Sequence, residues 1–506
     1  MSDDNSIDNQ PHLDLLAFVG QLVAGLEGEE RDEILAGLAV EYVPAGLVDD
    51  AASTADLIHD PFLRDSTIAQ IAVGSIAHGA NPLDLVDTID EPGTRAQAIE
   101  QVSLAYAQSG DFESASESAS DLDDSDPVMS AISMAAAQRG AAEEADRTAQ
   151  SIVTPDIRAT TLAELGSIAV RKDKPERAVE LADEASRVAE EIDFPQVRIY
   201  VTARLADLYG ELGNEEKATG MLSDALRMTH SEDDTAFESA KSFSKDEALA
   251  QIAPVFMRLK RYPEADAVME QIEDPFQFSS ASIQQALEFE RDGNREKTRE
   301  LLAEVREIVA GEEVFSELAV RNRDAVLGQL SLAFAMADDY EQAEQVVNQM
   351  AIESMKSNAV TDLGRYAAQA VRVNWAFHFA ENFSDSYQHA LYLLAIVDAF
   401  VSAERLDQAR SVAFRIIESL EKIENGYQRK LIQIEAGFWL IKVGEKEKGL
   451  QLLLTTAEEI RVMNDDLEKA RALLTLAGRF RNLDQSLRTP DRDRWQKIMN
   501  VASRTD

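Results

Sequence analysis

Apolar residues recur three and four positions apart along most of the chain, and the alternating pattern of β-strands is nearly absent. One apolar stripe runs from Ile99 to Tyr106, and a second runs from Ala115 to Leu122. Gly110 lies between them, followed by an aspartate. Because glycine commonly ends a helix in the left-handed conformation, this pattern predicts a helix, a tight turn and a second, antiparallel helix.

The same helix–turn–helix pattern is repeated along the chain at intervals of 30 to 47 residues, with a mean of about 36. This period is typical of arrays of helical hairpins, in which each unit buries its apolar face against its neighbours. The turns are expected near these twelve positions: Gly79, Gly110, Gly140, Asp173, Gly213, Lys260, Gly293, Asp338, Arg372, Glu404, Gly444 and Arg481. The longer intervals indicate insertions, chiefly at residues 230–245 and 311–322.

A small residue five positions after many of these turns supports the register, because it lets the second helix approach the first closely. The residues at this position are Ala115, Ala145, Ala178, Ala218, Ala265, Ala343 and Ala409. The internal pattern resembles the tetratricopeptide repeat over roughly residues 64–490. The copy that matches best contains Leu162, Leu165-Gly166, Ala169, Ala178, Ala182 and Ala185 at the family's spacings.

These observations predict an all-α protein, a right-handed α-solenoid of about twelve tetratricopeptide-like hairpins. We expect a disordered acidic tail at residues 1–11 and an N-terminal helical cap at 12–60. The solenoid itself is expected at 61–490, followed by a C-terminal helical cap or tail at 491–506. Caps are expected because the end of an array must not expose an apolar face.

Composition restricts the possible ligands more than it identifies one. The 506 residues include 93 Asp and Glu against 49 Lys and Arg, a formal charge of −44. Residues 1–150 alone hold 30 acidic and 5 basic side chains. Such a charge disfavours nucleic acid as a ligand, and it favours a monomer over a homo-oligomer. The acid-rich, lysine-poor composition resembles that of proteins from salt-loving archaea, with an acidic bacterial protein as the alternative.

The chain has no cysteine, so disulfides, thiolate nucleophiles and cysteine-ligated metals are excluded. No basic, apolar leader and no apolar run long enough to cross a bilayer is visible, so we expect a cytoplasmic protein without a membrane partner.

Candidate chemistry is sparse. His378 and His389 flank Glu381 and Asp385, but eleven helical residues would separate the two imidazoles by about 16 Å. Structural histidines are therefore favoured over a metal site. Glycine-rich phosphate loops, GxSxG and HExxH are absent, so we predict no enzyme, no metal and no cofactor.

Two regions are candidates for partner binding. The segment around residues 375–392 concentrates aromatic side chains, either as a bulky core or as a recognition pocket. The tetratricopeptide resemblance implies that the first helix of each hairpin lines a groove, which would be mostly small and apolar apart from Asp207 and Asp398. The partner-binding candidates are Met134, Met257, Leu287, Leu332, Phe438, Trp375, Phe379 and Tyr387.

The C-terminal stretch is the only basic-leaning region and includes Arg479, Arg481, Arg494 and Trp495. A solvated cap is the favoured interpretation. The alternative is a head-to-tail contact with the acidic N-terminal part of another copy.

The leading functional hypothesis is a scaffold or adaptor that binds a protein or peptide along the array. The first alternative is a regulatory protein that senses a ligand or peptide. A second alternative is an all-α toroid enzyme, which acidic residues converging on one cavity would favour.

Overall fold

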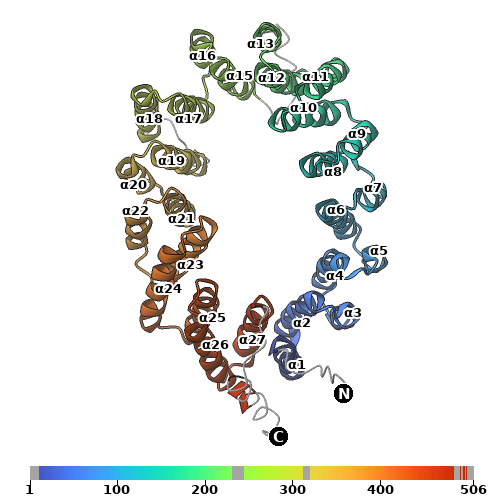
Figure 1. The fold of residues 1–506 in the computed structure, drawn as a ribbon, viewed down its shortest axis with the longest axis vertical. Coiled ribbons are helices and arrows are strands. Elements are labelled where there is room, and N and C mark those ends of the chain that lie inside the picture. Colours follow the sequence, from blue (N-terminus) through green and yellow to red (C-terminus); the bar gives the residue numbers. More distant parts are fainter. Residues whose placement is uncertain are drawn as a thin grey trace. The chain divides into compact units, whose positions relative to one another are not determined.

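The computed structural model describes residues 11–230, 244–311 and 319–483, together with residues 491, 494, 495, 497 and 498. The expected tail at 1–11 and most of the expected C-terminal cap at 491–506 lie outside the described residues, as does most of the 230–245 insertion. Every regular element described is helical, so the protein is an all-α array (Figure 1).

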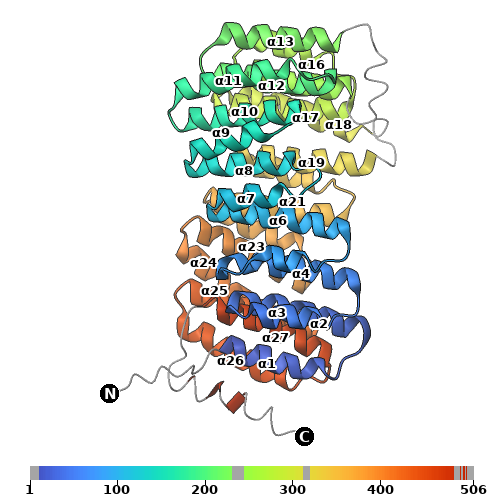
Figure 2. The same ribbon diagram turned by 90° about the vertical axis from the view of Figure 1, so that its right-hand side faces the viewer.

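The chain forms two compact units. Unit 1 contains residues 1–102 and 364–506, and unit 2 contains residues 103–363. The boundaries fall inside α6 (Pro92–Ser109) and α21 (Glu353–Gln369). In each unit, consecutive helices pair as antiparallel hairpins whose first helices form one layer and whose second helices form another (Figure 1). Figure 2 shows the helices of unit 2 from α8 to α13 lying side by side like rungs.

The remaining helices of unit 1 are α1 (Pro11–Val23), α2 (Gly28–Tyr42), α3 (Val48–Ala55), α4 (Pro61–Ser75), α5 (Pro82–Val86), α22 (Val373–His378), α23 (Ser386–Ser402), α24 (Leu406–Ser419), α25 (Gly426–Lys442), α26 (Lys446–Arg461) and α27 (Asp466–Arg481). Short 3₁₀ turns extend some of them: η1 (Val43–Ala45), η2 (Ile76–His78), η3 (Phe379–Asn382) and η4 (Leu420–Lys422).

The remaining helices of unit 2 are α7 (Phe112–Ala119), α8 (Asp126–Arg139), α9 (Ala142–Ser151), α10 (Pro155–Arg171), α11 (Pro175–Ala189), α12 (Pro195–Glu211), α13 (Glu215–Thr229), α15 (Lys245–Arg258), α16 (Tyr262–Met269), α17 (Pro275–Arg291), α18 (Arg295–Ala310), α19 (Ala319–Met336) and α20 (Tyr340–Val347).

The predicted turns coincide with the left-handed residues of the backbone at ten of twelve positions. At the eleventh, the left-handed residue is Val371 and the predicted Arg372 follows it. The twelfth prediction, Arg481, is wrong because this residue is the last of α27 and leads into a right-handed Asn482. Gly46 forms a further turn of the same kind, between α2 and α3, inside the segment expected to be a cap.

The small residues five positions after the turns are buried as expected, with 0 to 2% of each alanine exposed. In the hairpin of α21 and α22 the turn residue is Val371, one residue before the predicted Arg372. The residue five positions after Val371 is Ala376, which is fully buried. The hairpin of α21 and α22 therefore follows the common pattern, although the sequence suggested that it lacks the alanine.

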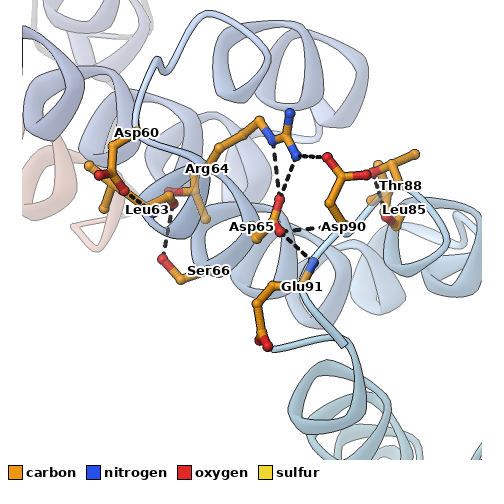
Figure 3. A network of polar contacts seen from close by, with 10 residues as sticks. Asp60, Leu63, Arg64, Asp65, Ser66, Leu85, Thr88, Asp90 and Glu91 are labelled. Carbon is orange, nitrogen blue, oxygen red and sulfur yellow. Dashed lines mark hydrogen bonds and ion pairs between the residues drawn. The ribbon is translucent and has the colours of Figure 1, made fainter. Parts of the chain in front are cut away.

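Five aspartates connect consecutive hairpins, and all of them except Asp246 are buried. The carboxylate of Asp65 in α4 accepts hydrogen bonds from the backbone N–H groups of Asp90 and Glu91, at 3.1 and 3.0 Å, just before α6 begins (Figure 3). Arg64 donates to the same carboxylate and to Asp90. Equivalent pairs of bonds are accepted by Asp32, Asp126, Asp246 and Asp324. Each carboxylate supplies partners to N–H groups that the next helix leaves unpaired.

The length of the second helix explains most of the irregular spacing. α11, α13, α18, α24 and α26 have 14 to 16 residues, whereas α3, α7, α16 and α20 have eight. The intervals of 40 residues after Asp173 and Glu404 therefore come from long helices, where the sequence suggested insertions.

Two helices from opposite ends of the chain, α1 and α27, pack on each other inside unit 1. α27 lies against α1 as the two helices of a hairpin do, and it lies against α2 as neighbouring first helices do (Figure 1). Arg481 forms an ion pair with Glu41 of the same chain, and Trp495 Nε1 donates to Asp14 at 2.8 Å. Arg481 and Trp495, in the stretch expected either to be solvated or to contact another copy, thus contact the acidic N-terminal part of their own chain. Arg479 and Arg494 pair instead with Glu435 and Glu458 in the C-terminal part.

Candidate binding groove

An open groove of about 660 Å³ lies among the second helices α11 and α13 and the N-terminal half of α12, in unit 2. Both second helices have 15 residues, whereas the second helices of several other hairpins have eight. Most of the groove-lining residues on these two longer helices lie in their C-terminal halves. The lining residues are Ser186, Ala189, Glu190, Ile192, Asp193, Pro195, Arg198, Thr202, Lys217, Met221, Asp224, Arg227 and Met228.

One part of the lining is apolar. Met221 and Met228 lie seven residues apart on α13, so they share one face of the helix, and both are half-buried. Ile192 and Ala189 lie at the end of α11 and are buried. Methionine is unbranched and polarizable, so these side chains can adapt to apolar groups of different shapes.

Phe194 stands next to this groove with 70% of its surface exposed. It occupies the N-cap of α12, and it makes no side-chain capping bond. The corresponding residues Asp60 and Asp274 each accept a bond from the third backbone N–H of their helix. A phenylalanine in place of such a cap costs about 1 kcal/mol of stability. A residue that breaks a local rule of the fold in this way is a candidate for a functional role.

The charged side chains that line the groove differ in whether they form ion pairs within the chain. Arg227 pairs with Asp224 one turn away on α13. Arg198, on α12, is half-buried, and no residue in the described part of the chain forms an ion pair with its guanidinium. A half-buried cation of this kind is a suitable partner for a carboxylate that comes from outside. Glu190 and Asp193 are exposed at the edge.

A polar cluster of Asp183, Tyr209 and Lys217 lies at one wall of the groove. Tyr209 is buried, and its hydroxyl donates to Asp183 Oδ1 at 2.7 Å. Lys217 Nζ donates to the same carboxylate at 2.8 Å and to the Tyr209 hydroxyl at 2.7 Å. The bonds from Lys217 and Tyr209 lower the pKa of Asp183. Burial alone would lower the pKa of Lys217, but its bonds to Asp183 and Tyr209 outweigh this effect and raise it.

Both partners are therefore charged at neutral pH, and burial raises the pKa of Tyr209 above its usual value. A lysine held fully protonated is a poor nucleophile and a poor general base. The cluster fixes the position of α13 against α11 and α12, and it presents an ammonium group to the groove.

The aromatic segment in unit 1 is packed as a core. Phe379 is fully buried, and the Tyr392 hydroxyl donates to the carbonyl of Ala376 at 2.6 Å. Trp375 and Tyr387 are half-buried. Because its side chain is inaccessible, Phe379 cannot contact a partner in this conformation.

The two histidines of this segment do not converge. His378 lies 3.6 Å from Glu381, whereas burial and the nearby Lys422 and Arg415 lower the pKa of His389. Across the described residues, no group of three His, Asp or Glu side chains could hold a metal ion.

The first-helix candidates divide by exposure. Met257 and Phe438 are buried at 3% and 7% exposed, so they belong to the packing between helices. Met134, Leu287 and Leu332 are half-buried and remain candidates for contact.

Ion pairs between successive first helices join Arg258 to Asp207 at 2.7 Å and Arg479 to Glu435 at 2.8 Å. Arg204 pairs in the same way with Glu164. This face is thus more polar than the sequence suggested, since cross-helix pairs are not visible in a one-dimensional pattern.

Sequence reasoning missed the groove. The signal was available in the loops, where Asp60 and Asp274 precede a helix-starting proline and Phe194 replaces them before Pro195. An aromatic residue at a position that is polar in most of the other hairpins is visible once the repeats are aligned on their first helices.

Comparison with known proteins gives only distant similarities. No model of a protein family matches the chain, and no curated protein matches it. Among solved structures, it is similar to Ton1535 from Thermococcus onnurineus NA1, with 14% identity, a TM-score of 0.24, and 69% of this chain and 94% of the other covered.

It is also similar to the STAND protein PH0952 from Pyrococcus horikoshii, which has a tetratricopeptide repeat sensor, with 12% identity and a TM-score of 0.24 over 89% of this chain and 67% of that one. The Cut9–Hcn1 hetero-tetramer of the APC/C matches at 10% identity and a TM-score of 0.21, covering 86% and 96%. The description of the fold rests on the hairpins themselves.

No helix in the described ranges is long and apolar enough to cross a membrane. The left-handed turns, the buried alanines and the paired helices recur through both units. The chain is an all-α solenoid of tetratricopeptide-like helical hairpins.

Proposed function

We propose that the protein is an interaction scaffold that holds a segment of a partner polypeptide in the groove of α11, α12 and α13. The observation that carries this proposal is the exposed Phe194 at a capping position, beside a groove with a half-buried Arg198 that forms no ion pair with any described residue. Aromatic and arginine side chains dominate the binding energy of many protein interfaces.

The chemistry of the lining suggests what the segment carries. Apolar side chains of the partner would pack on Ile192 and Met221, which line the groove, and on the exposed ring of Phe194 next to it. A carboxylate of the partner would accept hydrogen bonds from Arg198. The volume of about 660 Å³ suits several side chains and is too small for a folded domain.

A scaffold is favoured over a catalyst by the state of the one polar cluster at the groove. Lys217 and Asp183 neutralise each other and are hydrogen-bonded to Tyr209, so no group of this cluster is poised to move a proton at neutral pH. Absence of enzymatic activity stays a prediction, as does the choice between a passive scaffold and a sensor.

The test is quantitative capture of partners from the source cells with the tagged full chain, compared among three proteins. Variant Phe194→Asp/Arg198→Glu alters the groove. Variant Phe62→Asp is the matched control, because Phe62 is 69% exposed at the start of another first helix, α4, in unit 1.

We expect one or more proteins to be recovered equally by the wild type and the Phe62→Asp control, and at least about tenfold less by the groove variant. Equal recovery by all three proteins, or no specific partner with any of them, would contradict the proposal.

A further inference from the structure

The contact between the two ends of the chain differs from every other hairpin contact in the described array. In the other hairpins a short turn joins the two helices covalently. α27 and α1 pack as a hairpin although more than 400 residues separate them in sequence. We call the surface between α27 on one side and α1 with α2 on the other the terminal seam.

The terminal seam has a closely fitted apolar interior. Leu15, Leu16 and Val19 of α1 and Leu476 of α27 are at most 1% exposed. A Cβ atom on Gly37 of α2 would lie 2.9 Å from the side chain of Leu474, so α2 and α27 approach each other closely. The two surfaces are thus shaped for each other.

Complementary charge surrounds this interior. Arg471 of α27 forms an ion pair with Glu33 of α2, and Arg481 forms one with Glu41. Beyond α27 in the sequence, the fully buried Trp495, which is itself helical, donates its indole N–H to Asp14 of α1 at 2.8 Å. Basic residues gather on α27, whereas the N-terminal 150 residues carry a net charge of −25.

Such a seam contains no covalent link across it, so nothing in its chemistry requires both sides to come from one chain. Within one chain, tethering gives the second side a high effective concentration and favours the intramolecular contact. A second copy offers the same surfaces, so two chains can exchange them and bury the same residues.

We propose that the terminal seam is a self-association surface, at which α1 and α2 of one copy can pack on α27 of a second copy. The product is a dimer in which α27 of each chain packs on α1 and α2 of the other chain. It has two such exchanged seams, and each makes the same contacts as the seam within one chain. This inference is independent of the proposed function of the groove.

The test reverses the charges of the seam in the full chain. One variant carries Arg471→Glu and Arg481→Glu, and the other carries Glu33→Arg and Glu41→Arg. In either variant alone, both the intramolecular seam and an exchanged seam between identical chains place like charges together. In an equimolar mixture, both seams of an exchanged pair bring opposite charges together.

A chain with all four substitutions is the matched control, because it restores opposite charges within one molecule. Circular dichroism confirms that each protein is helical, and light scattering measures its mass at low salt. We expect each variant and the four-fold control to have the mass of one chain, and the mixture to shift to twice that mass.

A mixture that stays at the mass of one chain would overturn the proposal. Doubling of the mass in either variant alone would also overturn it, because association would then occur through another surface.

Discussion

In the described part of the chain, five residues other than glycine hold the left-handed conformation between paired helices, and one of them is β-branched. Val371 has a φ of 62°, where its Cβ atom crowds the backbone, whereas Asp173 and Asp338 belong to types that tolerate this region better. Seven of the other hairpin turns use glycine at the corresponding position. Val371 is therefore a local source of strain.

Replacement of Val371 by glycine is expected to raise the free energy of unfolding by about 1 kcal/mol. The relief of left-handed strain exceeds the extra entropy of glycine in the unfolded chain. Urea denaturation measures the change, and Gly213→Val at the equivalent turn should produce a loss of similar or greater size. A Val371→Gly protein less stable than the wild type would contradict the assignment of the turn.

The buried aspartates make stability depend on pH. Burial alone would raise the pKa of Asp126, but hydrogen bonds from Thr154 and Val153 outweigh it and lower the pKa below its usual value. A depressed pKa in the folded state stabilises the protein above about pH 4. This contribution is lost as the pH falls through the folded pKa.

Asp126→Asn is expected to lower the free energy of unfolding by about 1–3 kcal/mol at pH 7, because the amide replaces charge-assisted bonds with weaker ones. The difference from the wild type should shrink below about pH 4, because the carboxylate is protonated there in the unfolded chain and, at still lower pH, in the folded one. Denaturation curves at pH 7 and pH 3.5 provide the comparison. A difference that is constant over this range would show that the charge of Asp126 does not contribute.

At the scale of elements, a single aspartate distinguishes two kinds of hairpin. Asp32, Asp65, Asp126, Asp246 and Asp324 each lie fourteen residues before the left-handed residue of their hairpin. Their second helices have at most ten residues. After a short second helix, the chain returns to the start of the first helix. There the carboxylate accepts hydrogen bonds from the backbone N–H groups that lead into the next hairpin.

Hairpins with second helices of 14 to 16 residues have other residues at this position, namely Ala159, Ile199, Ser279, Ala390 and Lys430. The aspartate is thus a sequence signal for a short second helix. The hairpins that begin with α6 and α21 are exceptions, since they have short second helices with Ala96 and Ser357 there.

Glycines inside helices mark where two elements come closest. A Cβ atom on Gly449 of α26 would collide with the carbonyl oxygen of Gly437 in α25 and lie 2.6 Å from Ile441 Cγ1. Gly449 also lies five residues after the turn at Gly444, where most other hairpins have alanine. At this hairpin even a methyl group is too large.

Gly449→Ala is therefore expected to reduce the free energy of unfolding by about 1–3 kcal/mol through overpacking. Gly220→Ala in α13 is the matched control, because nothing lies within 4 Å of the added Cβ and the helix should gain up to about 1 kcal/mol. Thermal unfolding of the two variants should shift in opposite directions. A stabilised Gly449→Ala protein would contradict the packing of α25 on α26.

The sequence predicted the hairpins well because their signals are local. Gly110 and Ala115 define a turn and a close contact through neighbours along the chain. The groove was missed because it depends on helix length and on the relative placement of Phe194 and Arg198. The pairing of α1 with α27 was missed because no periodic pattern encodes a contact between the ends of a chain.

At the scale of the whole molecule, the acidic charge and the binding surface have separate roles. A formal charge of −44 disfavours nonspecific association with other anionic molecules. The groove of α11 to α13 lies in unit 2, and the terminal seam lies in unit 1. A change in one is therefore expected to leave the local structure of the other unchanged.

The central claim is that the partner binds in this groove. Amide hydrogen exchange of the full chain, measured with and without the captured partner, tests it most directly. We predict that exchange slows in residues 186–202 and 217–228, which contain the groove residues, while the other helices keep their rates. Slowed exchange elsewhere, for example along the first helices around Leu287 and Leu332, with the groove segments unchanged would contradict the claim.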